Sequence, residues 1–198
     1  MNVRITRKTF VYTTALFLGL VGCTAEMIVG AVPATQEEIA EMEPYLASEE
    51  ALRGFLAGHT RKTYDRFHGT QIEYFDTDGR AYLWYPGNGL AVPSFWKTES
   101  HWKTAANPMG ESELCFLYSR QAYNPVTREF GGLWECMKGE TALYLTDEVV
   151  AGDVFNLKSS FLPYVLPEGT DVSIRAALQQ SGRNVTIGEN RVTWDWRN

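Results

Sequence analysis

The residues in this sequence that could do chemistry are few, and the carboxylates come first. Glu73 and Asp76 flank an aromatic segment, and a glycoside hydrolase needs two carboxylates across a cleft. Nothing in the sequence brings a specific pair of carboxylates together, and a solvated strand face explains both residues more simply. Hydrolysis of a glycan, with Glu73 or Asp76 and an unidentified second carboxylate, is therefore the alternative function and not the main prediction.

The histidines do not form the pattern of a metal site. His59, His68 and His101 are not spaced like the ligands of a zinc site, so we interpret them as surface or turn residues. The sequence also lacks the Gly-x-Ser-x-Gly and His-Glu-x-x-His motifs and a GxxxxGK[ST] phosphate loop. We therefore predict no metal and no cofactor, and the protein is expected not to be an enzyme.

Aromatic residues crowd the middle of the chain and are more informative. Most of them are expected to pack in a core, but several should alternate to the opposite face of their strands. A small barrel with an aromatic-lined mouth can hold one apolar or sugar-like ligand. The side chains predicted to contact such a ligand are Tyr74, Trp84, Trp102 and Trp134.

The sequence has three cysteines, and two of them are predicted to form a disulfide. Cys115 and Cys136 are the pair that remains after Cys23, and an even pair in an oxidising compartment favours a bridge. Their spacing is not the CxxC of a redox site, and no CxxC or His pair lies nearby to complete a metal site. Two free buried thiols are the alternative.

The N-terminus has the features of a secretory signal peptide. Residues 1–8 carry positive charge and no acid, and residues 9–21 are uncharged and mostly apolar. That apolar run is short for a transmembrane helix, which needs about 20 residues. Residues 20–23 read Leu-Val-Gly-Cys and resemble the bacterial lipobox, in which Cys23 receives a lipid and the chain is cut just before it. Ordinary cleavage after Ala25 is the alternative.

A lipid on Cys23 would tether the protein to a membrane that the chain does not span. Each buried CH₂ of an acyl chain contributes about 0.8 kcal/mol, so several chains together anchor stably. Thr24 stands where an Asp would favour retention in the inner membrane of Gram-negative bacteria. We therefore predict the periplasmic face of the outer membrane, with a free periplasmic or secreted protein as the alternative. The predicted divisions are a signal peptide (1–22), a tether (23–34) and one domain (35–198).

Composition and charge exclude several classes of protein. The chain has 198 residues, and 18 Lys and Arg against 24 Asp and Glu give a formal net charge of −6. With 44% hydrophobic and 21% charged residues, it is not collagen-like, mucin-like or wholly disordered. The acidic balance also argues against a nucleic-acid partner, which needs a basic stripe on the protein.

The domain is expected to begin with two short helices. A capping box at residues 35–38 predicts a helix that runs to about Glu43, where Pro44 ends it or begins the next element. Ser48 opens a second helix with an apolar stripe, and Gly58 is its natural C-cap.

The rest of the domain is expected to be rich in strands. Aromatic runs at 71–76 and 80–85 surround an Asp-Gly turn, which is typical of a hairpin. Short strands separated by turn residues predict an α+β fold, mainly β, with an antiparallel barrel or sandwich that is lipocalin-like in outline. The other expected elements are strand pieces at 95–97 and 100–103, strands at 113–118, 130–137 and 141–145, a helix at 170–180 and a last hairpin at 185–196.

Several short segments in the middle of the chain form a recognisable order. They are 56–60 (LAGHT), 73–75 (EYF), 78–80 (DGR), Trp102, 114–118 (LCFLY) and 134–136 (WEC). This order resembles a family of small exported proteins of proteobacteria, rhizobia among them, that share a domain of unknown function. The similarity covers about Leu52 to Leu145, or about half of the chain. The resemblance implies export and a shared fold, and it transfers no catalytic residue.

The prediction for function is a membrane-anchored envelope lipoprotein that binds a small apolar or glycan ligand, or an envelope protein, without catalysis. A periplasmic glycan hydrolase and a structural subunit of an envelope complex are the alternatives. A deep cleft with two carboxyls about 5–10 Å apart would favour the hydrolase. An aromatic cavity without such a pair would favour the binding module, and an exposed apolar patch would favour the structural subunit.

Overall fold

The structure is a computed structural model that describes residues 36–101 and 111–187, except for the side chains of residues 38 and 39. All of these residues belong to one compact unit, Ala34–Asn198. The predicted signal peptide, lipid site and tether lie outside the described residues, as do Thr35 and the Glu38 side chain of the first capping box, Trp102 and most of the last hairpin.

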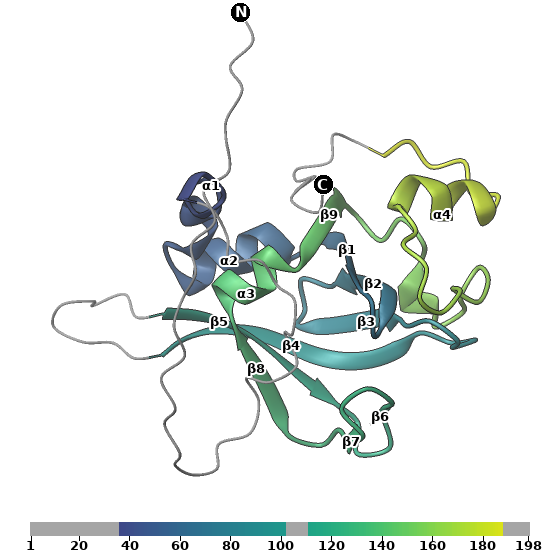
Figure 1. Ribbon diagram of the computed structural model, residues 1–198, viewed down its shortest axis with the longest axis horizontal. Coiled ribbons are helices and arrows are strands. Elements are labelled where there is room, and N and C mark those ends of the chain that lie inside the picture. Colours follow the sequence, from purple (N-terminus) through teal and green to yellow (C-terminus); the bar gives the residue numbers. More distant parts are fainter. Residues whose placement is uncertain (1–35, 102–110, 188–198) are drawn as a thin grey trace, which may run out of the picture. The chain divides into compact units, whose positions relative to one another are not determined.

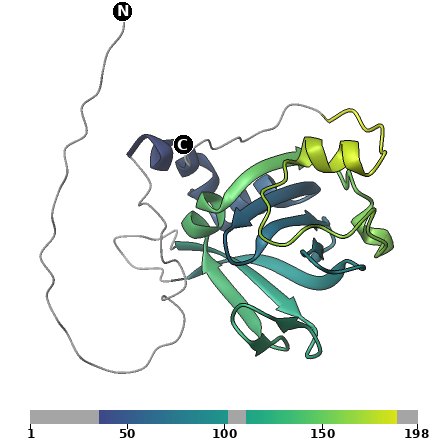
Figure 2. The ribbon, with the colours of Figure 1, turned by 45° about the vertical axis from the view of Figure 1, so that its right-hand side comes forward.

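Seven antiparallel strands form one sheet in the centre of the unit (Figure 1). They are β1 (His59–Asp65), β2 (Gly69–Phe75), β3 (Arg80–Trp84), β4 (Val92–His101), β5 (Glu111–Tyr118), β8 (Trp134–Lys138) and β9 (Thr146–Ala151). Their order in the sheet is β8-β5-β4-β3-β2-β1-β9, and the sheet curls into a half-barrel (Figure 2). This confirms the prediction of an α+β fold that is mainly β. A separate two-stranded hairpin consists of β6 (Tyr123–Asn124) and β7 (Glu129–Phe130).

Short helices complete the described chain. They are α1 (Gln36–Leu46), α2 (Glu49–Leu56), α3 (Gly139–Tyr144), α4 (Ile174–Gln180) and a 3-10 turn, η1 (Leu157–Ser159). α2 packs against β1, β4 and β5, and α3 packs against β5, β8 and β9. α1 contacts both α2 and α3, so these three helices cover the same part of the sheet.

The predicted second helix is confirmed, and its start follows from its sequence. The Ser48 side chain accepts a hydrogen bond from the backbone N–H of Ala51 (3.1 Å), which satisfies one of the free donors of the first turn. The helix ends at Leu56, two residues before Gly58, whose φ of +75° suits glycine. The buried face consists of Leu52, Phe55 and Leu56.

The prediction that Pro44 ends the first helix is wrong. α1 continues through Pro44 to Leu46. Met42 is buried, and the ring of Tyr45 lies 4.5 Å from the ring of Phe55 in α2. Packing of these side chains outweighs the local preference of proline for a helix end.

The predicted strand at 141–145 is also wrong, because these residues belong mainly to α3. Ala142 and Leu143 are both fully buried in the same core. Neighbouring residues of a strand point to opposite faces, whereas a helix can direct both toward one core. A Cβ on Gly139, the first residue of α3, would lie 2.6 Å from the Ser112 hydroxyl, so the close approach of α3 to β5 requires glycine.

The predicted hairpin over residues 71–85 is confirmed. β2 and β3 pair with Phe75 opposite Ala81, and the turn between them contains Asp78 and Gly79. Gly79 has a φ of +89°, which side chains other than glycine rarely adopt. The Asp-Gly pair therefore sets where this hairpin turns.

The remaining described elements occur where they were predicted, but they begin or end at different residues. Residues 95–97 and the described part of the piece expected at 100–103, residues 100–101, belong to one strand, β4. The helix expected over 170–180 begins later, at Ile174, because Ser173 caps it. β5 and β8 take the places of the strands expected at 113–118 and 130–137.

Each face of the sheet carries its own apolar core. The helix-side core joins α1, α2 and α3 to one face, and the C-terminal core joins residues 154–178 to the other. The strand residues of the helix-side core are Phe75, Ala81, Trp96, Leu114, Phe116 and Val149. Those of the C-terminal core are Ile72, Tyr74, Tyr82, Trp84 and Val150.

Candidate ligand-binding cavity

A cavity of about 630 Å³ lies on the helix-side face of the sheet, next to the helix-side core. β2 and β5 run through both regions: Phe75 and Phe116 lie in the core, whereas Gln71 and Tyr118 line the cavity. Every second residue of a strand shares a face, so these four side chains point to one side of the sheet. We call the part of this face under α1, α2 and α3 the closed end, and the part at the cavity the open end.

Loops from distant parts of the chain form the walls of the open end. The hairpin β6–β7 and its turn supply one wall, with Tyr123, Pro125 and Val126. The β1–β2 turn supplies Phe67, and the turn after β3 supplies residues 85–88. These segments come together only through the curled sheet that carries them.

Aromatic and acidic side chains dominate the chemistry of the lining. The rings belong to Phe67, Tyr85, Tyr118 and Tyr123, and the carboxylates belong to Glu129, Glu135 and Glu168. No Lys or Arg is found among the described residues that line the cavity. The cavity therefore combines stacking surfaces with negative charge.

His68 and Tyr85 form a hydrogen-bonded pair in the lining. His68 Nδ1 lies 2.9 Å from the Tyr85 hydroxyl, and the two rings meet edge to face. Burial lowers the pKa of His68, and the nearby Asp65 only partly opposes this shift. The imidazole is therefore neutral at pH 7, and it holds the Tyr85 hydroxyl without adding positive charge to the cavity.

A buried ion pair lies between the closed end and the open end. Arg61 on β1 contacts Glu73 on β2 at 3.1 Å, and the side chains are only 8% and 6% exposed. The guanidinium also lies over the ring of Phe75, 5.0 Å from its centroid. Burial raises the pKa of Glu73, while the charge and hydrogen bond of Arg61 oppose that shift. Removing either partner would leave a buried charge without compensation.

This ion pair also positions a residue of the cavity. The Tyr118 hydroxyl donates to the free oxygen of Glu73, Oε1, at 3.4 Å, and its ring stacks on Phe116. Burial and the charge of Glu73 raise the pKa of Tyr118 well above its usual value, so the hydroxyl stays protonated. Tyr118 is therefore a fixed, neutral wall of the cavity.

Of the four aromatic residues predicted for ligand contact, Tyr74, Trp84 and Trp134 do not line this cavity, and Trp102 lies outside the described residues. Tyr74 and Trp84 are buried in the C-terminal core, on the face opposite the cavity. Trp134 is 42% exposed, and Lys97 Nζ lies 4.6 Å from its ring. The cavity is instead lined by a different set of rings, of which Tyr118 shares its face with Phe116 two residues earlier.

The two carboxylates considered for hydrolysis point to different partners. Glu73 is held by Arg61 on the helix-side face. Asp76 contacts Lys158 of η1 at 2.5 Å, and this hydrogen bond lowers the pKa of Asp76. η1 contacts β2 and β3, and its buried Leu157 belongs to the C-terminal core. The structure therefore does not bring Glu73 and Asp76 into one site.

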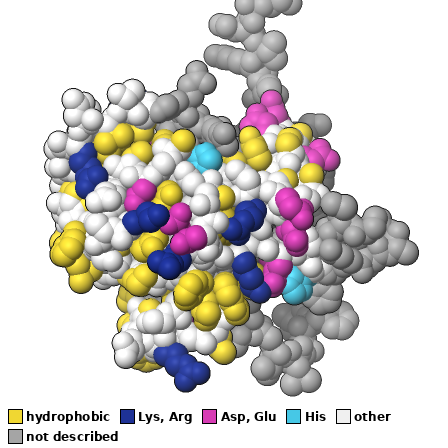
Figure 3. All heavy atoms as spheres, turned by 180° about the vertical axis from the view of Figure 1, so that it is seen from behind, with side chains coloured by type: hydrophobic (Ala, Val, Ile, Leu, Met, Phe, Trp, Pro, Cys, Tyr) yellow, Lys and Arg dark blue, Asp and Glu magenta, His cyan; other side chains and the backbone are white. Residues whose placement is uncertain are grey.

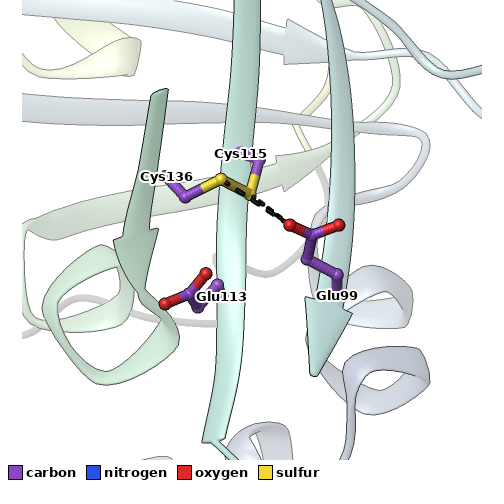
Figure 4. A group of neighbouring side chains, drawn as sticks. All are labelled: Glu99, Glu113, Cys115 and Cys136. Carbon is purple, nitrogen blue, oxygen red and sulfur yellow. Dashed lines mark hydrogen bonds between the residues drawn. A yellow bond between two sulfur atoms is a disulfide. The ribbon is translucent and has the colours of Figure 1, made fainter. Parts of the chain in front are cut away.

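The predicted disulfide is confirmed. Cys115 and Cys136 are opposite each other in β5 and β8, and their sulfurs are bonded (Figure 4). Glu99 and Glu113 offer carboxylate oxygens within 4.8 Å of these sulfurs, the geometry of a four-ligand metal site. The disulfide occupies both sulfurs, however, and Glu99 already contacts Lys97 at 2.5 Å and His101 at 2.8 Å. Glu113 also lies 3.6 Å from His101, so the oxidised protein offers two carboxylates here that both already have a partner.

Comparisons of the chain with protein-family models, with curated proteins and with solved structures found no match. In the part of the chain that the structure describes, no helix is both long and apolar enough to cross a membrane. The function is therefore argued from the cavity and its lining.

Proposed function

We propose that the protein is a binding module of the bacterial envelope, without catalytic activity, that holds a small ligand in the cavity at the open end. The observation that carries this proposal is the cavity of about 630 Å³, lined by aromatic rings and a few polar groups. Sites for small molecules are typically clefts of about 300–1,000 Å³ with this mixture of side chains. The closed end supplies a packed scaffold that holds the walls in place.

The location in the envelope is part of the same proposal. It is supported by the signal-peptide pattern of residues 1–21, by the lipobox that ends at Cys23 and by the resemblance to exported proteobacterial proteins. The Cys115–Cys136 disulfide is typical of proteins that fold in an oxidising compartment. A lipid on Cys23 would hold the module at the periplasmic face of the outer membrane, and the half-barrel with its cavity would then be lipocalin-like in outline.

Binding of a neutral apolar dye, N-phenyl-1-naphthylamine, tests the cavity. Ala122 lines the cavity, so Ala122→Trp should fill it and reduce the dye's fluorescence enhancement at least tenfold. Ala176 is exposed on α4, and Ala176→Trp adds the same side chain away from the lining. The control should bind the dye like the wild type. Equal binding by both variants, or no binding by the wild type, would overturn the proposal.

The intact mass of the protein purified from its own membranes tests the anchor. A mass that matches Cys23–Asn198 plus acyl chains would support the lipoprotein. A chain that starts at Glu26 without lipid would overturn the anchor, while the ligand-binding proposal would still stand on the dye experiment.

A second candidate, a subunit of an envelope complex, is favoured by one surface. Phe95 and Trp134 are 55% and 42% exposed, and both are register partners of Leu117 on the outer side of β4, β5 and β8. Figure 3 shows hydrophobic side chains gathered in a patch on the side seen from behind, next to charged side chains. A photo-crosslinking amino acid in place of Phe95 should then give one discrete cross-linked product in cells. The same replacement at Ala176 is the control, and the absence of a discrete product from position 95 would exclude this candidate.

A further inference from the structure

We propose, on the basis of the ligand-binding function above, that the ligand carries a positively charged ammonium group, which binds among the carboxylates and aromatic rings of the cavity. Three features of the cavity favour such a ligand: the charge of its lining, the negative potential at its tyrosine hydroxyls and its aromatic surfaces. Each can be read from residues that line the open end.

The charge in the lining is of one sign. Glu129, Glu135 and Glu168 line the cavity together with His68, which burial keeps neutral. Within residues 36–101 and 111–187, none of the three carboxylates forms an ion pair. The charged side chains among the described lining residues are therefore negative, and Arg66, beside Phe67, does not itself line the cavity.

The carboxylates act on one another and on the tyrosine hydroxyls. Partial burial raises the pKa of Glu135, and the nearby Glu129 raises it further. The charge of Glu135 also contributes to the raised pKa of Tyr118, although Arg61 behind the wall opposes it. At the other wall, Glu168 and Asp65 both contribute to the raised pKa of Tyr85 after burial. The negative potential therefore extends across the cavity and is not confined to one edge.

The rings of the cavity suit the same ligand group. An ammonium group is attracted to the face of an aromatic ring within about 6 Å of its centroid. One lining ring already makes this kind of contact, because the guanidinium of Arg66 lies 4.7 Å from the centroid of Phe67. Tyr118 offers a ring that is held in place by Glu73 and by stacking on Phe116.

Other ligand charges fit this lining less well. An anion would be repelled by Glu129, Glu135 and Glu168 together, with no lysine or arginine among the described lining residues to compensate. A neutral ligand can contact the rings but forms no ion pair with these carboxylates, so it should bind less tightly than a cation of the same shape.

A matched pair of probes tests the charge directly. Choline and its neutral isostere 3,3-dimethyl-1-butanol have nearly the same shape, so a difference in their binding reports the charge. Ligand-observed NMR titration of the full chain should show choline binding at least tenfold more tightly than the alcohol. Choline binding should also weaken as salt is added, because exposed charges are screened.

A matched pair of variants tests the residues. The double variant Glu129→Gln and Glu135→Gln should weaken choline binding at least fivefold and leave binding of the neutral dye unchanged. Glu41 and Glu43 are exposed on α1, so Glu41→Gln with Glu43→Gln makes the same change in net charge away from the cavity. This control should bind choline like the wild type. Glu168→Gln, on a different segment, should weaken choline binding by itself.

The outcomes separate this inference from the proposed function. If the dye binds in the cavity but choline and the alcohol bind equally, or neither binds, the ammonium inference is wrong and the cavity remains a binding site for another ligand. The same conclusion follows if both double variants weaken choline to the same extent. If Ala122→Trp leaves dye binding intact, the proposed function itself fails.

Discussion

The closed end and the open end belong to one face of one sheet, yet they differ in what covers them. At the closed end, α1, α2 and α3 bury Phe75, Trp96 and Phe116 in an apolar core. At the open end, the same strands present Gln71 and Tyr118 to a cavity bordered by loops. The difference teaches that a continuous sheet can carry a packed core and an open cavity side by side, with the Arg61–Glu73 ion pair between them.

The largest effect is expected from a change in the closed end. Phe55 is fully buried in the helix-side core, so Phe55→Ala should lower the free energy of unfolding by about 3–5 kcal/mol. Val92 lines the open end and is only partly buried, so Val92→Ala should cost about 1 kcal/mol or less. Urea denaturation measures both. Equal losses for the two variants would contradict the division of the face into two regions.

Breaking the ion pair between the two regions should lower the free energy of unfolding nearly as much. Glu73→Leu leaves Arg61 buried without its partner, so we expect a loss of about 3–5 kcal/mol. Arg61→Met combined with Glu73→Leu removes both charges and should recover at least half of that loss, because no buried charge remains. Thermal and urea unfolding of the three variants would measure this. If the double variant is no more stable than Glu73→Leu, the loss of stability does not come from a buried charge left without its partner.

Removal of the disulfide should destabilise β8 most, the strand that forms one side of the open end. The bridge joins residues 21 positions apart, for which the chain-entropy argument gives about 3 kcal/mol. Cys115→Ala with Cys136→Ala should therefore lower stability by that amount. Hydrogen exchange should also become faster in β8, the edge strand that carries Glu135, than in β2. Uniform acceleration in both strands would mean that the disulfide does not act on the open end in particular.

The smallest expected effect is a change of ligand affinity with pH. Because the pKa of Glu135 is raised above its usual value, this carboxylate gains a proton at a higher pH than an ordinary glutamate. Binding of choline should be full at pH 7 and should weaken severalfold as pH falls through that pKa toward pH 4. Binding of the neutral dye should not follow this change. In the Glu129→Gln and Glu135→Gln variant, the pH dependence of choline binding should be smaller than in the wild type, because only Glu168 remains of the three lining carboxylates.

The sequence predicted those features that depend on nearby residues. The Asp-Gly pair at 78–79 is enough for the β2–β3 hairpin, because the turn needs a positive φ at Gly79. Ser48 and the apolar stripe after it were enough for α2. The pairing of Cys115 with Cys136 followed from their number in a chain predicted to be exported, although nothing local showed that β5 and β8 are neighbours.

The tertiary structure alone decided which faces are covered. Alternation places Tyr74 and Trp84 on the same face of β2 and β3, but it does not say that residues 154–178 bury that face. The wrong prediction at residues 141–145 has a similar cause. A short apolar run fits a strand or a helix equally well, and packing in the core selects the helix. Local patterns determine turns, caps and alternation. The cavity depends on segments that meet across long stretches of chain, so only the folded molecule shows which rings and carboxylates line it.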